Sequence, residues 1–278
     1  MMGNALERRK DSDADFRAFE IRGIRVAAVD VFRARDLICA RDPPAKGEYV
    51  TVTGAHGIVE STYDERVLEA HQQAAMVVAD GMPLVWLGRL LGYGSIGRVN
   101  GPELMEVIFE KEAYRKLKHF FYGGNQSVVT NFKNVMTSRF DNFNMVGAHY
   151  PPFNPLGFSE DEEVLSRIRA LQPDIIWVGL STPKQEVWMR MHMHKIGCGI
   201  GVGVGAAFDL LSGTTRRAPR WIQRSGFEWL FRLIVEPRRL YKRYLFVIPQ
   251  FAYFWLQTLF KLRYKMLLEY ANNINARS

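Results

Sequence analysis

The sequence is poor in cysteine, and the two cysteines that it has lie far apart. Cys39 and Cys198 are the only ones among 278 residues, and neither belongs to a CxxC or Cys/His cluster. A disulfide scaffold is therefore excluded, and both side chains are expected to be buried in a reduced compartment. Because 47% of the residues are hydrophobic, the chain can bury a core, which excludes a disordered or collagen-like protein.

Long apolar runs are also missing. No stretch reaches the roughly 18 uninterrupted apolar residues of a membrane-spanning helix. Residues 1–22 carry many charges where a signal peptide would have its apolar region. We therefore expect a cytoplasmic protein.

Several catalytic motifs are absent as well. The sequence contains no GxxxxGK[ST], HExxH or GxSxG, so P-loop, zinc-protease and serine-triad chemistry have no support. Asp11, Asp13 and Asp15 have DxD spacing, but they lie in a polar segment and follow no predicted strand. We expect no metal site and no cofactor.

Negative charge is scarce at the C-terminal end. Residues 216–278 hold 13 Lys/Arg and 3 Asp/Glu, a balance of +10, which leaves 24 basic and 26 acidic residues, a balance of −2, in the rest of the chain. The same segment contains Trp221, Trp229 and Trp255. A basic and aromatic segment suits an anionic partner, which is either a membrane surface or a nucleic acid.

From about residue 23 to 205, short apolar runs alternate with amphipathic stretches. This pattern predicts an α/β fold, with a Rossmann-like, mostly parallel sheet and flanking helices. The expected strands are Arg25–Val31, Tyr49–Thr53, Ala75–Ala79, His119–Tyr122, Met145–Ala148, Ile175–Val178 and Gly199–Val204. Helices are expected at Gly101–Ala113, Ser127–Arg139 and Ser159–Leu171, with Ser159 as an N-cap.

After Arg216 the strand-like runs end, and bulky apolar residues recur at helical spacing. Leu245–Phe260 is the most apolar part, but it has 16 residues and contains Pro249, so an interfacial helix fits better than a spanning one. We expect three parts: a polar tail (1–22), a catalytic core (23–215) and a basic helical appendage that associates with membranes (216–278).

In α/β sheets, ligands bind beyond the carboxyl ends of the strands, so polar residues that follow an apolar run are candidates. Asp80 follows one such run and precedes Gly81 and Pro83, where it is either a general base or a helix N-cap. Arg98 and Asn100 come 18 and 20 residues later. Thr53 and His56 follow another run; for these two, a glycine-rich turn with a satisfied histidine is the simpler interpretation.

Two further strand ends carry candidates. Lys184 and Gln185 lie at an expected helix N-terminus, which favours anions such as a diphosphate. Gly205 and Asp209 belong to GVGVGAAFD, whose glycines allow close approach of a nucleotide. A Rossmann-type NAD-dependent oxidoreductase is therefore one alternative, with Glu228 as its only nearby ribose ligand. A nucleic-acid-binding module is another, although aliphatic Leu245–Phe260 fits lipid better than bases.

Taken together, these motifs resemble the WecG/TagA/CpsF family, glycosyltransferase family 26. The matching segments, in chain order, are TGAHGIVES, ADGMPLVWLGR, RVNGPEL, FYGG, GAHYPPF, PDIIWVGLSTPKQEVWM, GVGAAFDLLSG and RRAPRWIQRSGFEWLFRLIVEPRRLYKRY. The resemblance implies transfer of a sugar from a UDP-sugar to a polyprenyl-diphosphate-linked sugar on the cytoplasmic membrane face. It also implies inversion and no DxD metal site.

The resemblance also implies roles for individual residues. Asp80 matches the proposed base, Thr53 and Arg98 match the lining of the same pocket, and Gln185 matches a further active-site residue. Tyr150 or Phe153, together with Asp209, matches the surroundings of the uridine. His56, Asn100, Lys184 and Gly205 are expected to contact substrate. Arg232, Arg239 and Arg243 match basic residues of an appendage implicated in membrane contact and in closing the site over the diphosphate.

One position departs from the family pattern. Many members have T-x-N where this chain has Thr53, Gly54 and Ala55, and Ala55 cannot make the hydrogen bonds of an asparagine. A hexose donor such as UDP-glucose is therefore as credible as UDP-N-acetylmannosamine. We expect exopolysaccharide or cell-surface polysaccharide synthesis, an anionic inner-membrane surface as partner and no nucleic acid. Whether the enzyme acts as a homo-oligomer is left open.

Overall fold

The computed structural model describes residues 16–40, 46–151, 162–215, 218–219, 221–222 and 226–275. For residue 239 and residues 261–275 it describes the backbone. The predicted N-cap Ser159, the candidate Phe153 and the Asp11–Asp15 segment lie outside the described residues.

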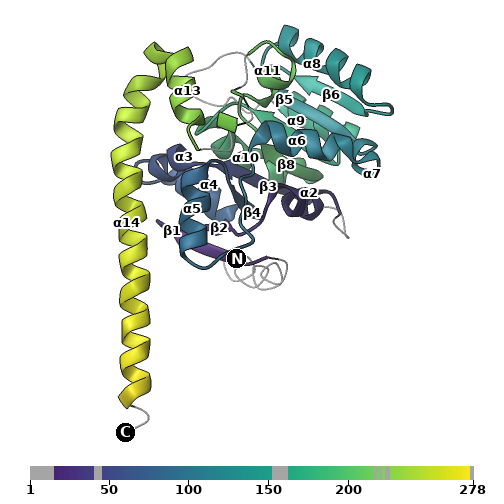
Figure 1. The fold of residues 1–278 in the computed structure, drawn as a ribbon. Helices are drawn as coiled ribbons and strands as arrows, with labels where there is room; N and C mark the ends of the chain where they lie inside the picture. Colours follow the sequence, from purple (N-terminus) through teal and green to yellow (C-terminus); the bar gives the residue numbers. More distant parts are fainter. Residues whose placement is uncertain are drawn as a thin grey trace.

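The core of the protein is a six-stranded parallel sheet in the order β4-β3-β8-β7-β5-β6 (Figure 1). This confirms the predicted α/β class. The strands are β3 (Lys46–Thr53), β4 (Met76–Ala79), β5 (His119–Gly123), β6 (Met145–His149), β7 (Ile175–Gly179) and β8 (Gly199–Gly203). Each corresponds to an expected strand, because parallel strands covered on both faces are almost continuously apolar.

Side chains on the two faces of the sheet enter different cores. Val50 and Val52 of β3 join a cluster under α2 (Val31–Cys39), α6 (Gly101–Glu110), α8 (Gln126–Arg139) and α11 (Ala207–Leu211). Tyr49 faces the other way, in a cluster with α9 (Glu162–Leu171) and α10 (Lys184–Ile196). Helices on both faces leave the carboxyl edge of the sheet as the place for a site.

The first predicted strand, Arg25–Val31, is wrong in extent and in partner. Strand β2 (Ile24–Ala27) pairs in antiparallel fashion with β1 (Ala18–Ile21) in a separate sheet. It ends early because the Asp30 side chain accepts a hydrogen bond from Arg33 N and caps α2. Strand β1 lies within the predicted polar tail, yet Phe19 and Ile21 are buried, so the ordered core begins before residue 23.

The expected helix Gly101–Ala113 is two helices, α6 and the short α7 (Glu112–Arg115). Helix α8 begins one residue before the prediction, because the side chain of Asn125 caps it by accepting from Val128 N. Three further helices follow the first strands of the sheet: α3 (Ala55–Glu60), α4 (Glu65–Gln73) and α5 (Met82–Leu90).

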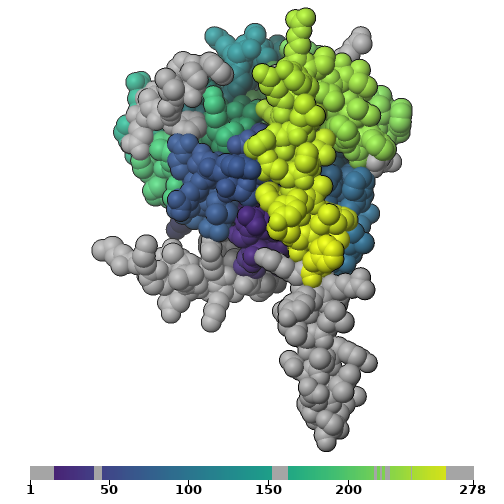
Figure 2. Space-filling view, turned by 90° about the vertical axis from the view of Figure 1, so that its left-hand side faces the viewer, coloured from purple at the N-terminus to yellow at the C-terminus, as the bar shows by residue number. Residues whose placement is uncertain are grey.

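The appendage contains α13 (Glu228–Val235) and α14 (Pro237–Asn275), a helix of 39 residues that extends past the core (Figure 1). Pro249 lies inside α14 without ending it. Val247, Phe251 and Phe254 are buried in a cluster with Ile58 and Leu84, and α14 lies along α3 and β1 (Figure 2). This packing on both sides of Pro249 holds the helix together.

None of the helices in the described part of the chain has the length and hydropathy needed to cross a membrane.

Candidate active site

Asp80 lies at the carboxyl edge of the sheet, directly after β4. Its backbone N–H donates to the carbonyl oxygen of Thr53 at 2.7 Å, so the ends of β3 and β4 are tied together. A Cβ on Gly54 would lie 2.4 Å from the Asp80 carbonyl oxygen, and Gly81 has a φ of 106°. Two glycines therefore allow the tight turn that presents this carboxylate beside the N-terminus of α5.

The surroundings of Asp80 favour its protonated form more than water does. The side chain reaches solvent, but protein crowds around the carboxylate, and this desolvation raises its pKa to about 6. The positive charges of Arg232 and Arg98 oppose the rise, whereas Glu228 and Glu103 add to it. A carboxylate with a pKa just below neutrality is ionised at pH 7 and can accept a proton.

Core and appendage meet in an ion-pair network beside Asp80. Arg98 Nη1 donates to Glu228 Oε2 at 2.7 Å, and Arg232 Nη2 donates to Glu228 Oε1 at 2.9 Å. Arg98 also pairs with Glu103 at 3.4 Å. Glu228 therefore joins an arginine of the core to an arginine of α13.

Asn100 is a helix cap as well as a neighbour of this network. Its side-chain oxygen accepts from Glu103 N at 3.0 Å, and its Nδ2 donates to Glu103 Oε2 at 3.0 Å. The next residue, Gly101, touches the end of β8, since a Cβ there would lie 2.5 Å from the Val204 carbonyl oxygen. Asn100 thus fixes the start of α6 against the centre of the sheet.

Gln185 is buried, and both the oxygen and the nitrogen of its amide form hydrogen bonds inside the protein. Its Oε1 accepts from the backbone N–H of Gly205 at 2.9 Å, and its Nε2 donates to Glu186 Oε1 at 3.1 Å. Thr182 Oγ1 donates to the same carboxyl oxygen at 2.9 Å. Burial raises the pKa of Glu186. Gln185 therefore fastens the loop after β8 to the N-terminus of α10.

Thr53 ends β3, but its hydroxyl faces the interior. Thr53 Oγ1 lies 3.5 Å from His71 Nε2, and His71 Nδ1 lies 3.0 Å from Thr51 Oγ1. A Cβ on Gly57 would lie 2.0 Å from Thr53 Oγ1, so glycine makes room for this pair. Burial lowers the pKa of His71 to about 4, so the ring between the two threonines is neutral at pH 7.

His56 lies on α3, where its Nε2 is 3.1 Å from Glu60 Oε1. Burial lowers the pKa of His56 to about 4, and the charge of Arg243 on α14 contributes to the lowering. His56 therefore lies at the contact between core and appendage. Arg232 and Arg243 are described on α13 and α14, whereas the side chain of Arg239 lies outside the described residues.

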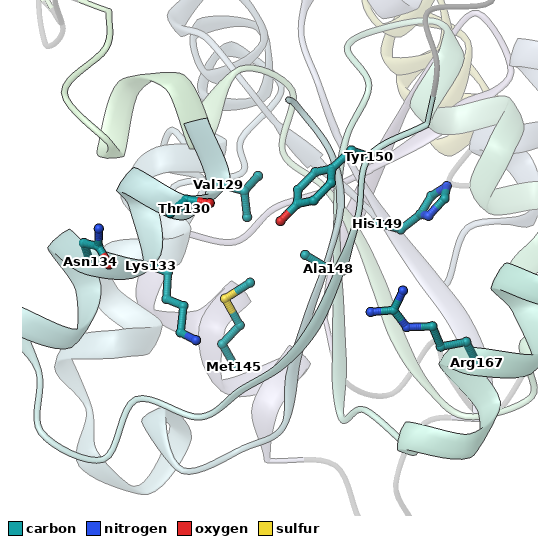
Figure 3. A pocket seen from close by; sticks show the side chains of 9 residues that line it. All are labelled: Val129, Thr130, Lys133, Asn134, Met145, Ala148, His149, Tyr150 and Arg167. Carbon is teal, nitrogen blue, oxygen red and sulfur yellow. The ribbon is translucent and has the colours of Figure 1, made fainter. Parts of the chain in front are cut away.

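Tyr150 lies far from Asp80. It follows β6, five strand positions from β4, which corresponds to about 24 Å at the usual strand spacing. It lines a cavity of about 530 Å³ with Lys133 of α8 and Arg167 of α9 (Figure 3). This cavity is not part of the surroundings of Asp80. Of the two other candidates, Lys184 is the first residue of α10, and Asp209 lies in α11. Burial raises the pKa of Asp209.

The structure therefore gathers Asp80, Arg98, Asn100 and Arg232 near one strand end, and Gln185 with Gly205 two strands away. Glu103 and Glu228 belong to the first group although sequence analysis did not select them for it. Glu103 was visible as the third residue after Asn100, the spacing of a helix cap. Glu228 lies 130 residues from Arg98, and nothing in the sequence joins the two.

Among the described residues, no three His, Cys, Asp or Glu side chains are grouped so that they could hold a metal ion. Glu228, the ribose ligand of the oxidoreductase alternative, is instead paired with two arginines.

The doubly covered parallel sheet, with an ionisable carboxylate and arginines beyond its strand ends, is the arrangement of an α/β enzyme, and its candidate site suits an anionic ligand. Residues 19–265 match the sequence profile of the glycosyl transferase WecG/TagA/CpsF family, and the chain belongs to this family. It is a glycosyltransferase.

The curated relatives include N-acetylglucosaminyldiphosphoundecaprenol N-acetyl-beta-D-mannosaminyltransferases from Staphylococcus aureus strains COL and MW2. Each is 31% identical over 193 residues, which cover 69% of this chain and 73% of the relative.

Proposed function

We propose that this glycosyltransferase moves a sugar from a UDP-sugar to a polyprenyl-diphosphate-linked sugar, with inversion and without a metal ion. The observation that carries the proposal is the position of Asp80, a carboxylate at the carboxyl end of β4 that lies within range of the charges of Arg98 and Arg232. A base and two cations at one strand end suit the attack of a hydroxyl on a carbon that bears a diphosphate.

In the proposed reaction, Asp80 removes the proton from the acceptor hydroxyl. The acceptor oxygen forms its bond to the anomeric carbon from the face opposite UDP, and the bond from that carbon to the diphosphate oxygen breaks. UDP leaves with the electron pair, and the configuration inverts. Arg98 and Arg232 stabilise the negative charge that grows on the departing diphosphate, in the role that a metal ion has in other transferases.

The donor would lie along the carboxyl edge, with its sugar near Asp80 and its uridine towards β6. Glycines line this path. A Cβ on Gly123, which ends β5, would lie 2.5 Å from the Gly179 carbonyl oxygen, and Gly124 has a φ of 68°. Gly205 and Asp209 lie midway, and Tyr150 lies at the far end, where its ring would stack on the uracil base.

The acceptor class follows the relatives, whose name specifies a diphosphoundecaprenol-linked N-acetylglucosamine. The donor of this chain is either UDP-N-acetylmannosamine or UDP-glucose. Ala55 supports the second, because an alanine at the first position of α3 offers no side-chain hydrogen bond to an N-acetyl group. The product would enter an exopolysaccharide or another cell-surface polysaccharide.

A lipid-linked acceptor requires contact with a membrane, and the appendage offers it. On α14, Leu245 is 73% exposed and Phe260 is 68% exposed, and residues 245–260 contain no charged side chain. Basic residues such as Arg238, Lys242 and Arg243 precede them. We place the protein peripherally on the cytoplasmic face, where each nearby Lys or Arg adds about 1 kcal/mol of attraction to anionic lipid.

The test is a transfer assay in EDTA with UDP-glucose, UDP-N-acetylmannosamine, UDP-N-acetylglucosamine and UDP-glucuronate, and with synthetic lipid-diphosphate-sugar acceptors. We expect turnover of one of the first two donors, and the anomer of the product reports inversion. Loss of turnover in EDTA that is restored by Mg²⁺ would contradict metal independence. Failure to bind UDP would contradict the donor class.

A further inference from the structure

Glu228, the first residue of α13, links the appendage to Arg98 of the core. Its two carboxylate oxygens are used separately: one accepts from Arg98 of the core at 2.7 Å, and the other accepts from Arg232 of the same helix at 2.9 Å. The side chain of Glu228 is 23% exposed and that of Arg98 is 12% exposed. A charge pair in such a sheltered place has a more defined geometry than one on an open surface.

Arg98 is held from two sides. Glu103, at the start of α6, pairs with it at 3.4 Å and is itself held by Asn100. Glu228 supplies the shorter pair and comes from α13. The direction of the Arg98 guanidinium therefore depends on whether α13 is seated on the core.

Asp80 is affected by the same groups. The charged side chains whose fields act on it are Arg232 and Glu228 of α13, Arg98 before α6 and Glu103 in α6. A carboxylate at position 228 offsets part of the positive charge that the two arginines bring towards Asp80. Without it, the arginines would stabilise ionised Asp80 more strongly.

We propose that Glu228 is a positioning residue that seats α13 on the core and aims Arg98 and Arg232 at the substrate diphosphate. This inference rests on the proposed function for the reaction that it serves. The seating of α13 is independent of the reaction and can be measured without substrate.

The first experiment is hydrogen exchange of the α13 amides in the full-length protein. We expect Glu228→Gln and Arg98→Gln each to speed exchange at least tenfold, and the double variant to exchange no faster than either single one, because both remove the same pair. Glu112→Gln, which removes the surface pair of Glu112 with Lys116, is the matched control. Unchanged exchange in Glu228→Gln, or additive effects, would overturn the seating role.

The second experiment is the pH profile of kcat/KM. In Glu228→Gln we expect the plateau to fall at least tenfold and the acidic limb to move to lower pH by half a unit or more. Glu228→Asp keeps the charge, so its limb should stay in place although its plateau falls. A purely structural role would leave the limb of Glu228→Gln unmoved, and that result would overturn the proposal.

The two experiments fail in different ways. If the wild-type protein transfers no sugar from any donor, the proposed function is wrong, while the exchange data still decide whether Glu228 seats α13. If the wild-type protein is active and the limb does not move, only the role of Glu228 is wrong.

Discussion

At the scale of single residues, the position of Asp80 joins two properties that a general base needs. Its backbone is fixed by the bond to Thr53 and by the tight approach of Gly54, and crowding raises its pKa to about 6. Base strength grows with pKa, but a base must also be ionised at the working pH. A value just below neutrality satisfies both requirements.

Asp80→Asn should lower transfer by about a thousandfold, within the usual range for loss of a general base, and leave UDP affinity within twofold. In the wild-type protein, the rate should fall as pH drops below about 6, because Asp80 gains a proton and can no longer accept one. Initial rates and calorimetric UDP binding measure these effects. Asp141→Asn, in an exposed turn, is the control. Normal turnover in Asp80→Asn would remove this residue from the mechanism.

The buried ring of His71 should make the free energy of unfolding depend on pH. Its pKa is lowered to about 4 by burial, whereas a histidine in an unfolded chain titrates near 6.5. Between these values the unfolded state binds the extra proton, so stability falls as pH falls. From pH 7 to pH 5, His71 alone should cost about 2 kcal/mol of unfolding free energy.

His71→Gln lacks this proton uptake, so the substitution should destabilise the protein less at pH 5 than at pH 7, by about the same 2 kcal/mol. Urea unfolding of both proteins at both pH values measures the difference. His194→Gln, at an exposed position of α10, is the matched control. An equal cost of His71→Gln at the two pH values would contradict a neutral buried ring.

At the scale of elements, hydrophobic patterns in the sequence predicted the helices and strands whose formation depends on nearby residues. Apolar runs identified β3 to β8 because those strands are buried on both faces. Strand β1 was missed because it has only four residues and its large buried side chains, Phe19 and Ile21, form no continuous apolar run. The continuity of α14 through Pro249 was missed because it depends on contacts with α3 and β1, which are about 190 and 230 residues away.

The same distinction between local pattern and long-range contact applies to the residues of the candidate site. Asp80, Gln185 and Gly205 were predictable because each follows an apolar run. The inward turn of Thr53 was not, since it depends on His71 of α4. The distance of Tyr150 from Asp80 follows from strand order, which the sequence did not specify. The pairing of Glu228 with Arg98 depends on how the appendage packs.

The exposed apolar side chains of α14 are expected to contact lipid. Leu245, Tyr253 and Leu256 are 73%, 58% and 49% exposed, so replacing all three with serine should leave the fold intact. We expect binding to vesicles of phosphatidylglycerol and phosphatidylcholine to weaken at least tenfold, because about 100 Å² or more of apolar contact per side chain is lost. Phe32→Ser, exposed on α2, is the control. Unchanged vesicle binding would show that another surface meets the lipid.

At the scale of the whole molecule, charge is separated between two parts. Residues 216–278 carry +10 and the rest carries −2, so the molecule has a strong electrical polarity. A polar molecule of this kind turns its basic part towards an anionic surface before contact. Figure 2 shows α14 lying across one side of the core, so that one side would approach first.

Binding to anionic vesicles should therefore weaken at least tenfold between about 50 and 500 mM NaCl, since the Debye length falls from roughly 14 Å to 4 Å. Binding to vesicles of phosphatidylcholine alone should be weak at both concentrations. Sedimentation with vesicles measures both. Equal binding to charged and neutral vesicles would show that apolar contact alone holds the protein.

The strand order also governs how the molecule comes into being. Strand β8, the last strand of the sheet along the chain, pairs with β3, the first, and some 150 residues separate them. During translation, the edge of β3 that pairs with β8 has no partner until β8 has left the ribosome. The nascent chain thus has an unpaired strand edge that can associate with other chains, whereas in the folded enzyme this edge is paired. Chaperones would be needed most at this stage.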